Sequence, residues 1–432
     1  VDFGPRVGFA YAFHPQTVLR GAYGNFYGGE ENQGGNPNRG ESAPFNFSPQ
    51  LNRPGDVGLF QPNPFFAGGA WTGGVSAGYP LQVFSGFPVS SLQFRSLATN
   101  FRNPMVQKWN FAIQHELPGQ MALEVSYVGN HSSHQLLQPD FNACPNFYTR
   151  DSSITCDTLR NLKLNGAYAG IGSISGTATF GWGNYHGMTA KLEKRLTNGL
   201  QFVTAYTYGH ALANSGTTLR GSNGNYTKDP TNYNTSYANA AWDIRHNFTT
   251  AFNYDIPFGR GRKYGANINP VVNALIGGWA TNGILTLHSG QPFTVRSNGC
   301  IGVWGGGSSC SPILIAGRDP NAAPSNGRSP DHWFDTTSFL APTDALPGGN
   351  LGLQTNYGPP GRTLDFSLFK DFAFTERIGL QFRAEATNIS NTPQFNVANV
   401  DVNRQDGAAF GTISGTNTGS ERHIQFALRL HF

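Results

Sequence analysis

The stretch that decides the fold is residues 107–128, QKWNFAIQHELPGQMALEVSYV. Apolar and polar side chains alternate on both sides of Pro118, Gly119 and Gln120. Alternation with a period of two indicates a strand with one apolar and one polar face. Proline and glycine between two such runs favour a tight turn. The stretch therefore predicts a β-hairpin, with Glu124 on its polar face.

The same unit recurs in residues 186–208, around Asn198 and Gly199. Asn-Gly between two alternating runs is the strongest short signal for a hairpin. Apolar side chains lie on one face of the first run, and the other face carries Lys191, Glu193 and Arg195. A third hairpin is predicted over residues 362–390, with Arg383 and Glu385 on its polar face.

The longest alternating run is WDIRHNFTTAFNYDI, residues 242–256, with Arg245 on its polar face. Its roughly fifteen residues exceed an ordinary strand of five or six. That length suits a tilted strand in the wall of a membrane barrel. The chain ends in another alternating run, RHIQFALRLHF, whose last apolar residue is Phe432.

The composition supports an all-β membrane protein. Charged residues are 12% of the 432, about half the usual share, whereas aromatic residues reach 13% and glycine 55 positions. Disordered chains have the opposite bias. The net charge of +4, without a basic cluster on one predicted face, argues against nucleic-acid binding. No run of about 18 apolar residues predicts a membrane-spanning helix, but barrel strands need none.

Long polar loops alternate with the short turns. We expect them at residues 28–103, 131–183, 210–240, 292–361 and 392–420. Outer-membrane barrels have this asymmetry, with short periplasmic turns and long extracellular loops. We count about eleven strands, an odd number that cannot close antiparallel, and an open edge in lipid is costly. The prediction is therefore an all-β, antiparallel transmembrane β-barrel that is partial here, with about 22 strands when complete.

The four cysteines lie in predicted loops as two close pairs. Four cysteines allow three pairings, and closeness within one loop favours Cys144 with Cys156 and Cys300 with Cys310. Disulfides in such loops indicate an oxidising compartment. The cysteine spacing, without nearby histidines, argues against a metal site.

Several blocks of the sequence resemble one family. They are NPMVQKWNFAIQHELPGQMALEVSYVGNHSSH (103–134), NYHGMTAKLEKRLTNGLQFVTAYTYGHAL (184–212), WDIRHNFTTAFNYDIPFGRGRKYG (242–265) and DFSLFKDFAFTERIGLQFRAEATNISNTPQFNVAN (365–399). In this order they resemble the Oar-like, carboxypeptidase-regulatory-domain branch of the TonB-dependent outer-membrane receptors. The final strand, ending in Phe432, resembles the terminal aromatic signal that the barrel-assembly machinery reads.

The resemblance implies a transporter in the outer membrane of a Gram-negative cell, powered through a TonB–ExbB–ExbD complex. Residues 1–432 would be the C-terminal part of its barrel, with the N-terminal plug, the TonB box and the early strands outside this sequence. Partners would be outer-membrane lipid and a small or oligomeric solute. Residues predicted to face the lumen are Glu124, Lys191, Glu193, Arg195, Arg245, Arg383 and Glu385. They would contact plug or solute, or form the hydrated inner wall that polar-lined barrels have anyway.

Two other functions stay open at this point. One is a passive outer-membrane channel or adhesion barrel, and the other is a soluble secreted all-β binding protein. An enzyme is disfavoured, because the sequence has no phosphate-loop or His-Glu-x-x-His motif, and its Gly-x-Ser-x-Gly match, GVSAG at residues 74–78, lies in a predicted loop instead of a strand-to-helix turn. We therefore predict no catalytic residue, no cofactor and no metal. The transported substrate cannot be inferred, since loops carry no transferable code.

Overall fold

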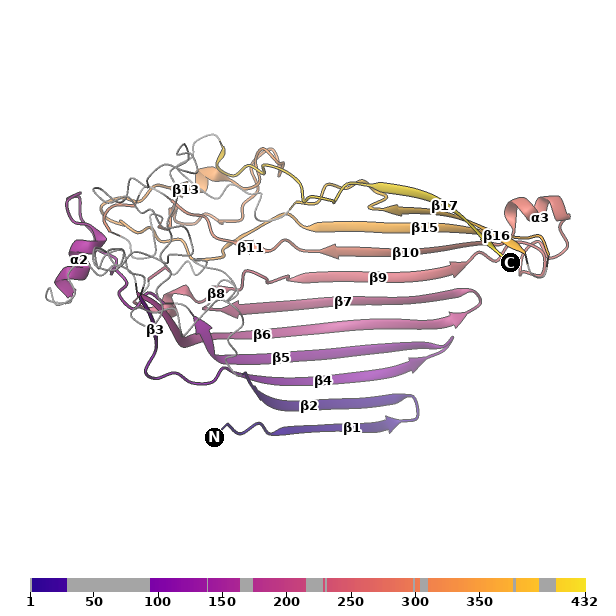
Figure 1. Cartoon of the computed structure of the whole chain (residues 1–432), viewed down its shortest axis with the longest axis horizontal. Coiled ribbons are helices and arrows are strands. Elements are labelled where there is room, and N and C mark those ends of the chain that lie inside the picture. The colour runs from indigo at the N-terminus through magenta and orange to yellow at the C-terminus, as the bar shows by residue number, and fades with distance from the viewer. Residues whose placement is uncertain are drawn as a thin grey trace, which may run out of the picture.

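The structure is a computed structural model that describes residues 2–28, 94–137, 139–163, 174–214, 228–229, 231–297, 300–303, 310–375, 378–395 and 409–432. One large β-sheet dominates these residues (Figure 1). Its long strands lie side by side in chain order, and each pairs antiparallel with the next. The antiparallel all-β architecture is therefore confirmed.

The main path through the sheet has eleven strands within the described residues: β1 Arg6–His14, β2 Thr17–Tyr27, β4 Met105–Leu117, β5 Met121–Leu137, β6 Ile174–Thr197, β7 Leu200–Ala213, β9 His246–Asp255, β10 Trp279–His288, β15 Gly361–Ala373, β16 Gly379–Thr387 and β17 His423–His431. Smaller elements are β3 Phe94–Leu97, β8 Ala238–Asn239, β11 Pro292–Phe293, β12 Ile313–Leu314, β13 Phe339–Leu340, β14 Asn356–Tyr357, α2 Cys156–Lys163, α3 Pro270–Ile276, η3 Tyr233–Ser236 and η4 Thr336–Ser338. Strand β3 runs parallel to β6, and the short pairs β11–β14 and β12–β13 are separate sheets.

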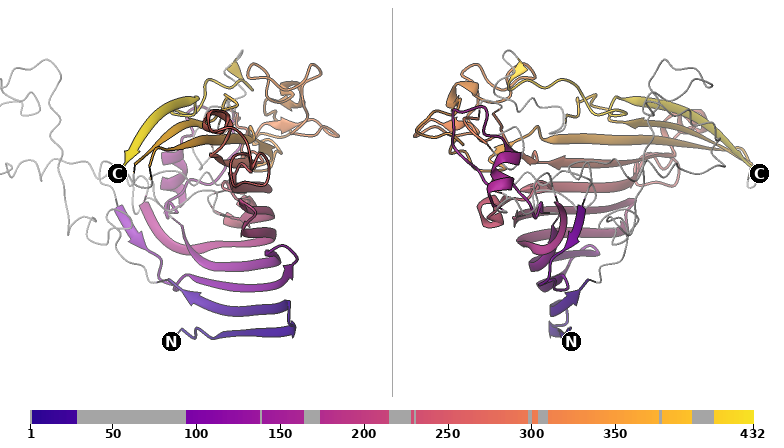
Figure 2. Two further views of the ribbon diagram at one scale, coloured as in Figure 1. Left: turned by 90° about the vertical axis from the view of Figure 1, so that its right-hand side faces the viewer. Right: turned by 60° about the vertical axis from the view of Figure 1, so that its left-hand side comes forward.

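The sheet curls into an open arc. The end-on view of Figure 2 shows this curvature, with β1 at one edge and β17 at the other. Both edge strands are exposed along their whole length. The described residues thus form part of a barrel wall, and the total of about 22 strands stays a prediction.

One face of the sheet is apolar and uncovered by protein. Phe426 and Leu428 on β17 are 72% and 68% exposed, and Met188 on β6 is 53% exposed. No second sheet or helical layer covers these side chains in the described part of the chain. In water such a surface would be far larger than a soluble monomer exposes, so its natural environment is lipid. No helix among the described residues has the length and apolar character to span a membrane.

Short turns and long connections gather at opposite ends of the sheet (Figure 1). The short turns in the described residues are those at residues 15–16, 118–120 and 198–199. The connection from β9 to β10, residues 256–278, lies at the same end but is longer and contains α3. Asn269 caps this helix by accepting from the Val271 N–H at 2.8 Å, and Pro270 occupies its first turn.

Strand boundaries differ from the sequence prediction in two places. Strands β5 and β6 extend to Leu137 and from Ile174, so the two ends of the predicted loop 131–183 are strand. The pairing there contains irregularities between Ser132 and Leu137, which interrupt the alternation on which the prediction relied. In contrast, β9 begins at His246 instead of residue 242. The predicted loop 28–103 lies mostly outside the described residues.

Aromatic rings fill spaces that glycines leave on the sheet. Gly187 on β6 pairs with Gly209 on β7, and the ring of Tyr185 lies across both. A Cβ added at Gly187 would meet the Tyr185 hydroxyl at 2.3 Å. The missing side chains therefore allow the ring to lie flat on the polar face, a common way to compensate glycine in curved sheets.

Candidate functional site

The polar face of the sheet joins residues that are distant in sequence. One row of residues, each directly opposite the next on the neighbouring strand, crosses the sheet: Glu124, Lys191, Ala205, Thr249, Thr286 and Thr363. A second row is Gln201, Asn253, Asn282, Ser367, Glu385 and Gln425. Directly opposite residues in an antiparallel pair point to the same side, so Glu124, Lys191 and Glu385 share one face.

This face carries ion pairs between neighbouring side chains. Lys191 Nζ lies 3.1 Å from Glu193 Oε2, and Arg383 lies 3.0 Å from Glu385. Gln425 donates to Glu385 at 2.5 Å, and the Arg383 guanidinium lies 5.0 Å from the centre of the Phe369 ring. These charges are about one third to one half exposed, as in a hydrated wall. Their contact with a plug or a solute stays a prediction.

Two further predicted lumen residues lie at the ends of their strands, and whether they face the lumen stays a prediction. Arg245 precedes β9, and its guanidinium donates to the Tyr357 hydroxyl at 3.2 Å, so it belongs to the loop end of the sheet. Arg195 is exposed near the β6–β7 turn, where the pairing register shifts between Lys194 and Thr197.

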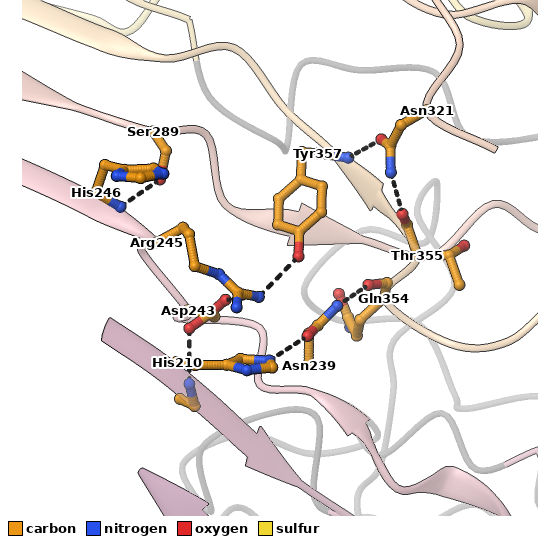
Figure 3. Close-up of polar contacts among 11 residues, drawn as sticks. His210, Asn239, Asp243, Arg245, His246, Ser289, Asn321, Gln354, Thr355 and Tyr357 are labelled. Atoms are coloured by element: carbon orange, nitrogen blue, oxygen red, sulfur yellow. Dashed lines mark hydrogen bonds and ion pairs between the residues drawn. The ribbon is translucent and has the colours of Figure 1, made fainter. Parts of the chain in front are cut away.

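A buried polar network, the rim network, holds the loop end of β7 and β9 (Figure 3). Asp243 is at its centre: its Oδ1 accepts from the Ala211 N–H at 2.7 Å, and its Oδ2 lies 3.2 Å from Arg245. The Asp243 side chain is only 1% exposed. The Asp243 side chain thus binds the backbone of β7 three residues before β9 begins at His246.

The network continues into the next loop. His210 Nε2 lies 2.9 Å from Asn239 Oδ1, and the Asn239 amide donates to the Gln354 carbonyl at 2.9 Å. The Asn321 side chain accepts from the Tyr357 N–H at 2.8 Å and donates to the Thr355 carbonyl (Figure 3). Segments more than one hundred residues apart are thereby fixed to one another at the rim.

The loops above the rim have a hydrophobic core of their own. Its buried members, the loop core, are Phe293, Val295, Phe334, Phe339, Leu351, Phe410 and Ile413. The Phe334 ring makes edge-on contacts with Phe339 and Phe410, at centroid distances of 5.6 and 5.3 Å. Aromatic pairs in this arrangement add to the burial energy. The described loops are thus packed structures.

A disulfide joins Cys300 and Cys310, with Cα atoms 5.7 Å apart. The other predicted pair, Cys144 and Cys156, is not bonded in the structure. The thiol of Cys144 is buried and lies 3.5 Å from the Pro145 carbonyl, whereas Cys156 begins α2. The predicted pairing is therefore present for Cys300 with Cys310 and absent for Cys144 with Cys156.

A cavity of about 530 Å³ opens between the loop after β5 and the segment around η3. Its walls include Phe141, Phe180 and Tyr233, with Asp140 and Asn234 beside them. Burial raises the pKa of Tyr233 to about 12, and the charge of Asp140 adds to this effect. The phenol therefore remains a hydrogen-bond donor at every physiological pH. This cavity combines apolar walls with polar groups, as small-molecule sites do.

Histidines that the sequence analysis missed pair with tyrosines on the apolar face. Tyr127 Oη lies 2.7 Å from His186 Nδ1, and Tyr206 Oη lies 2.8 Å from His246 Nδ1. Both pairs join neighbouring strands: Tyr127 and His186 lie in mid-strand, and His246 begins β9 at the loop end. The sequence did contain a signal for this position: His186 is two residues from Met188 on the same strand, so both side chains lie on the apolar face. Tyrosine with a satisfied hydroxyl is typical of membrane interfaces.

These features define the wall of a transmembrane β-barrel: a curved antiparallel sheet with an uncovered apolar face, a charged polar face and packed loops at one end. The chain belongs to the outer membrane beta barrel domain family, whose model matches residues 1–425. Its location is accordingly the outer membrane of a Gram-negative cell, and the alternative of a soluble secreted protein is wrong. Within the described residues no cluster of three or more potential metal ligands occurs.

Solved structures similar to the chain include the outer membrane transporter YddB from Escherichia coli, at 9% identity and a TM-score of 0.43, covering 98% of this chain and 40% of that one. The ferric-catecholate import receptor Fiu from E. coli K12 matches at 9% and 0.41, covering 99% and 34%. The siderophore receptor PirA from Pseudomonas aeruginosa matches at 9% and 0.39, covering 100% and 42%. The chain thus spans less than half the length of these structures. No curated protein matches it.

Proposed function

We propose that the chain is the C-terminal part of the barrel of a TonB-dependent receptor, which imports a bulky nutrient across the outer membrane. The observation that carries the proposal is the polar face, where Lys191–Glu193 and Arg383–Glu385 form ion pairs at 3.1 and 3.0 Å. Such pairs are stable on a hydrated surface and costly in lipid. An interior of this kind supports passage of a polar solute or contact with a plug.

The two open edges support a larger barrel. Among the strands that the structure describes, β1 and β17 each have one row of backbone groups without a partner strand. In lipid each unpaired group costs several kcal/mol, so further strands must complete the wall. About eleven more would give the size of barrel whose lumen holds a plug. The resemblance to TonB-dependent receptors adds an energised plug upstream of the chain.

The packed loops support a receptor role. The loop core and the rim network fix the described loops before any solute arrives, so binding would need little ordering of the loops. The cavity beside Tyr233 is one place where a solute could be held first. A passive channel has no need of such preorganised loops.

Conductance together with TonB binding tests this function. The full-length protein would be placed in a planar lipid bilayer, and binding of the periplasmic domain of TonB would be measured in parallel. We expect no steady ion current, because a plug closes the lumen, and specific TonB binding that is lost when the segment upstream of the plug is removed. A large steady current without TonB binding would identify a passive channel. The absence of both a steady current and TonB binding would support an adhesion barrel.

A further inference from the structure

Helix α3 exposes an apolar surface at the short-turn end of the sheet. Val271 and Leu275 are 71% and 69% exposed, and Val272 and Ile276 are 44% and 45% exposed. These four side chains occupy one continuous arc of the helix, because residues one turn apart share a side. Figure 1 shows α3 beyond the ends of the strands, where no other described segment covers it. This surface has no protein partner within the described residues.

The contacts at the end of α3 place it on the lipid side of the wall. Trp279 Nε1 donates to the Leu275 carbonyl at 2.9 Å, and Lys370 Nζ donates to the Gly277 carbonyl. Trp279 and Lys370 are paired in register, and Lys370 is paired in turn with Phe382. Phe382 stacks on Phe426 of the apolar face, so all these residues point toward lipid.

The end of helix α3 covers the charged side chain of Lys370. It lies on the apolar face of β15 yet is only 2% exposed. Its ammonium lies 5.8 Å from the Trp279 ring centre and 4.9 Å from that of Phe372. A bare ammonium on the lipid face would be destabilising. The carbonyl end of a helix is electronegative, so the end of α3 satisfies this charge while its apolar side remains outward.

The connection that contains α3 also carries basic side chains. The connection 256–278 contains Arg260, Arg262 and Lys263 and no acidic residue. All three are exposed, and the Arg262 guanidinium reaches Asp255 only at 4.0 Å. Apolar side chains beside a basic cluster are the features of a segment that lies in the plane of a membrane interface. By the rule for outer-membrane barrels, this end of the sheet is periplasmic.

We propose that residues 256–278 form a lipid anchor, in which α3 lies in the periplasmic leaflet and its basic cluster binds phospholipid phosphate groups. The lipid-facing wall continues directly into the apolar arc through Trp279, which favours a lipid occupant over a protein. The anchor shields Lys370 and fixes the depth of the barrel in the membrane. It depends on the barrel fold and not on TonB.

Photocrosslinking tests the anchor. A benzophenone amino acid would replace Leu275 in the full-length protein, reconstituted in nanodiscs of equal phosphatidylcholine and phosphatidylglycerol. Phe426 on the lipid face is the positive control, and Leu346 in the loops is the negative control. We expect lipid adducts at position 275 at a yield near that of 426. Adducts as rare as those at 346 would overturn the proposal, as would crosslinking in cells to a protein in place of lipid.

The basic cluster has a separate readout. One basic residue near an anionic surface is worth about a factor of five in binding, so at position 275 we expect phosphatidylglycerol adducts to exceed phosphatidylcholine adducts about fivefold or more. The variant Arg260→Gln/Arg262→Gln/Lys263→Gln should bring this ratio close to one. Heat-modified gel mobility would confirm that the variant is folded. Equal adducts of both lipids in the unsubstituted protein would overturn the role of the cluster.

Discussion

Asp243 and Arg245 form an ion pair at 3.2 Å on the loop side of the entrance to β9. The pair is asymmetric, because Asp243 is 1% exposed and Arg245 22% exposed. Asp243 also accepts the Ala211 N–H of β7, and Arg245 donates to Tyr357 of β14. Two side chains separated by one residue thus connect three segments of the rim network.

Replacing Asp243 should loosen the rim. Asp243→Ala leaves the Ala211 N–H without its acceptor and removes the ion pair with Arg245, and removing one partner of a buried pair costs about 3 kcal/mol. The readout is hydrogen exchange of the Ala211 amide. Asp255→Ala is the matched control, because its pair with Arg262 is exposed and 4.0 Å long, and such pairs contribute little. Equal exchange in the two variants would contradict the central role of Asp243.

Gly187→Ala should destabilise the wall by about 2 kcal/mol, because the new Cβ would displace the Tyr185 ring. The measurement is the midpoint of thermal unfolding of the reconstituted barrel. Combining Gly187→Ala with Tyr185→Ala should cost less than the sum of the single changes, since the clash is gone. Strict additivity would show that the ring and the glycine are independent.

Reducing the disulfide should destabilise the loop core and spare the wall. A bridge between Cys300 and Cys310 closes a short loop, which is worth about 2–3 kcal/mol through the entropy of the unfolded chain. We expect faster proteolysis near Phe293 in Cys300→Ser or under a reducing agent. Cleavage between the wall strands should not change. A Cys156→Ser variant, which leaves this bridge intact, serves as the control.

Acid should weaken the exposed contact between the loops that carry Arg150 and Asp344. Hydrogen bonds from Arg150 and Tyr148 hold the pKa of Asp344 below its ordinary value of 3.8, and the Arg150–Asp344 contact is 2.5 Å long. The carboxylate form stabilises this contact, so the contribution is complete above pH 3.8 and is lost as the pH falls through the lower pKa of the folded state. Spin labels introduced at Ser153 and Ala345 should report a wider distance only below that range. Asp344→Asn should give the same widening at neutral pH.

Deleting residues 421–432 should abolish insertion into the outer membrane. The deletion removes β17 and exposes the backbone of β16 to lipid, at several kcal/mol for each unpaired group. Fractionation and heat-modified gel mobility measure the outcome. Removing Phe432 alone preserves every β17 pairing, so we expect slower assembly but unchanged stability of the assembled barrel. Normal insertion of the longer deletion would argue strongly against the barrel assignment.

The sequence by itself determined the hairpins, because alternation and turn chemistry are local: residues 107–128 and the Asn198–Gly199 turn form as predicted. It also identified the polar face that carries Lys191 and Glu385, since alternate residues of a strand point to opposite faces of the sheet. Only the tertiary structure decided the rim network, where Arg245 meets Tyr357 across 112 positions, and the burial of Lys370 beneath α3. These contacts depend on which long connections pack together after the sheet has formed, and no local period in the chain encodes that packing.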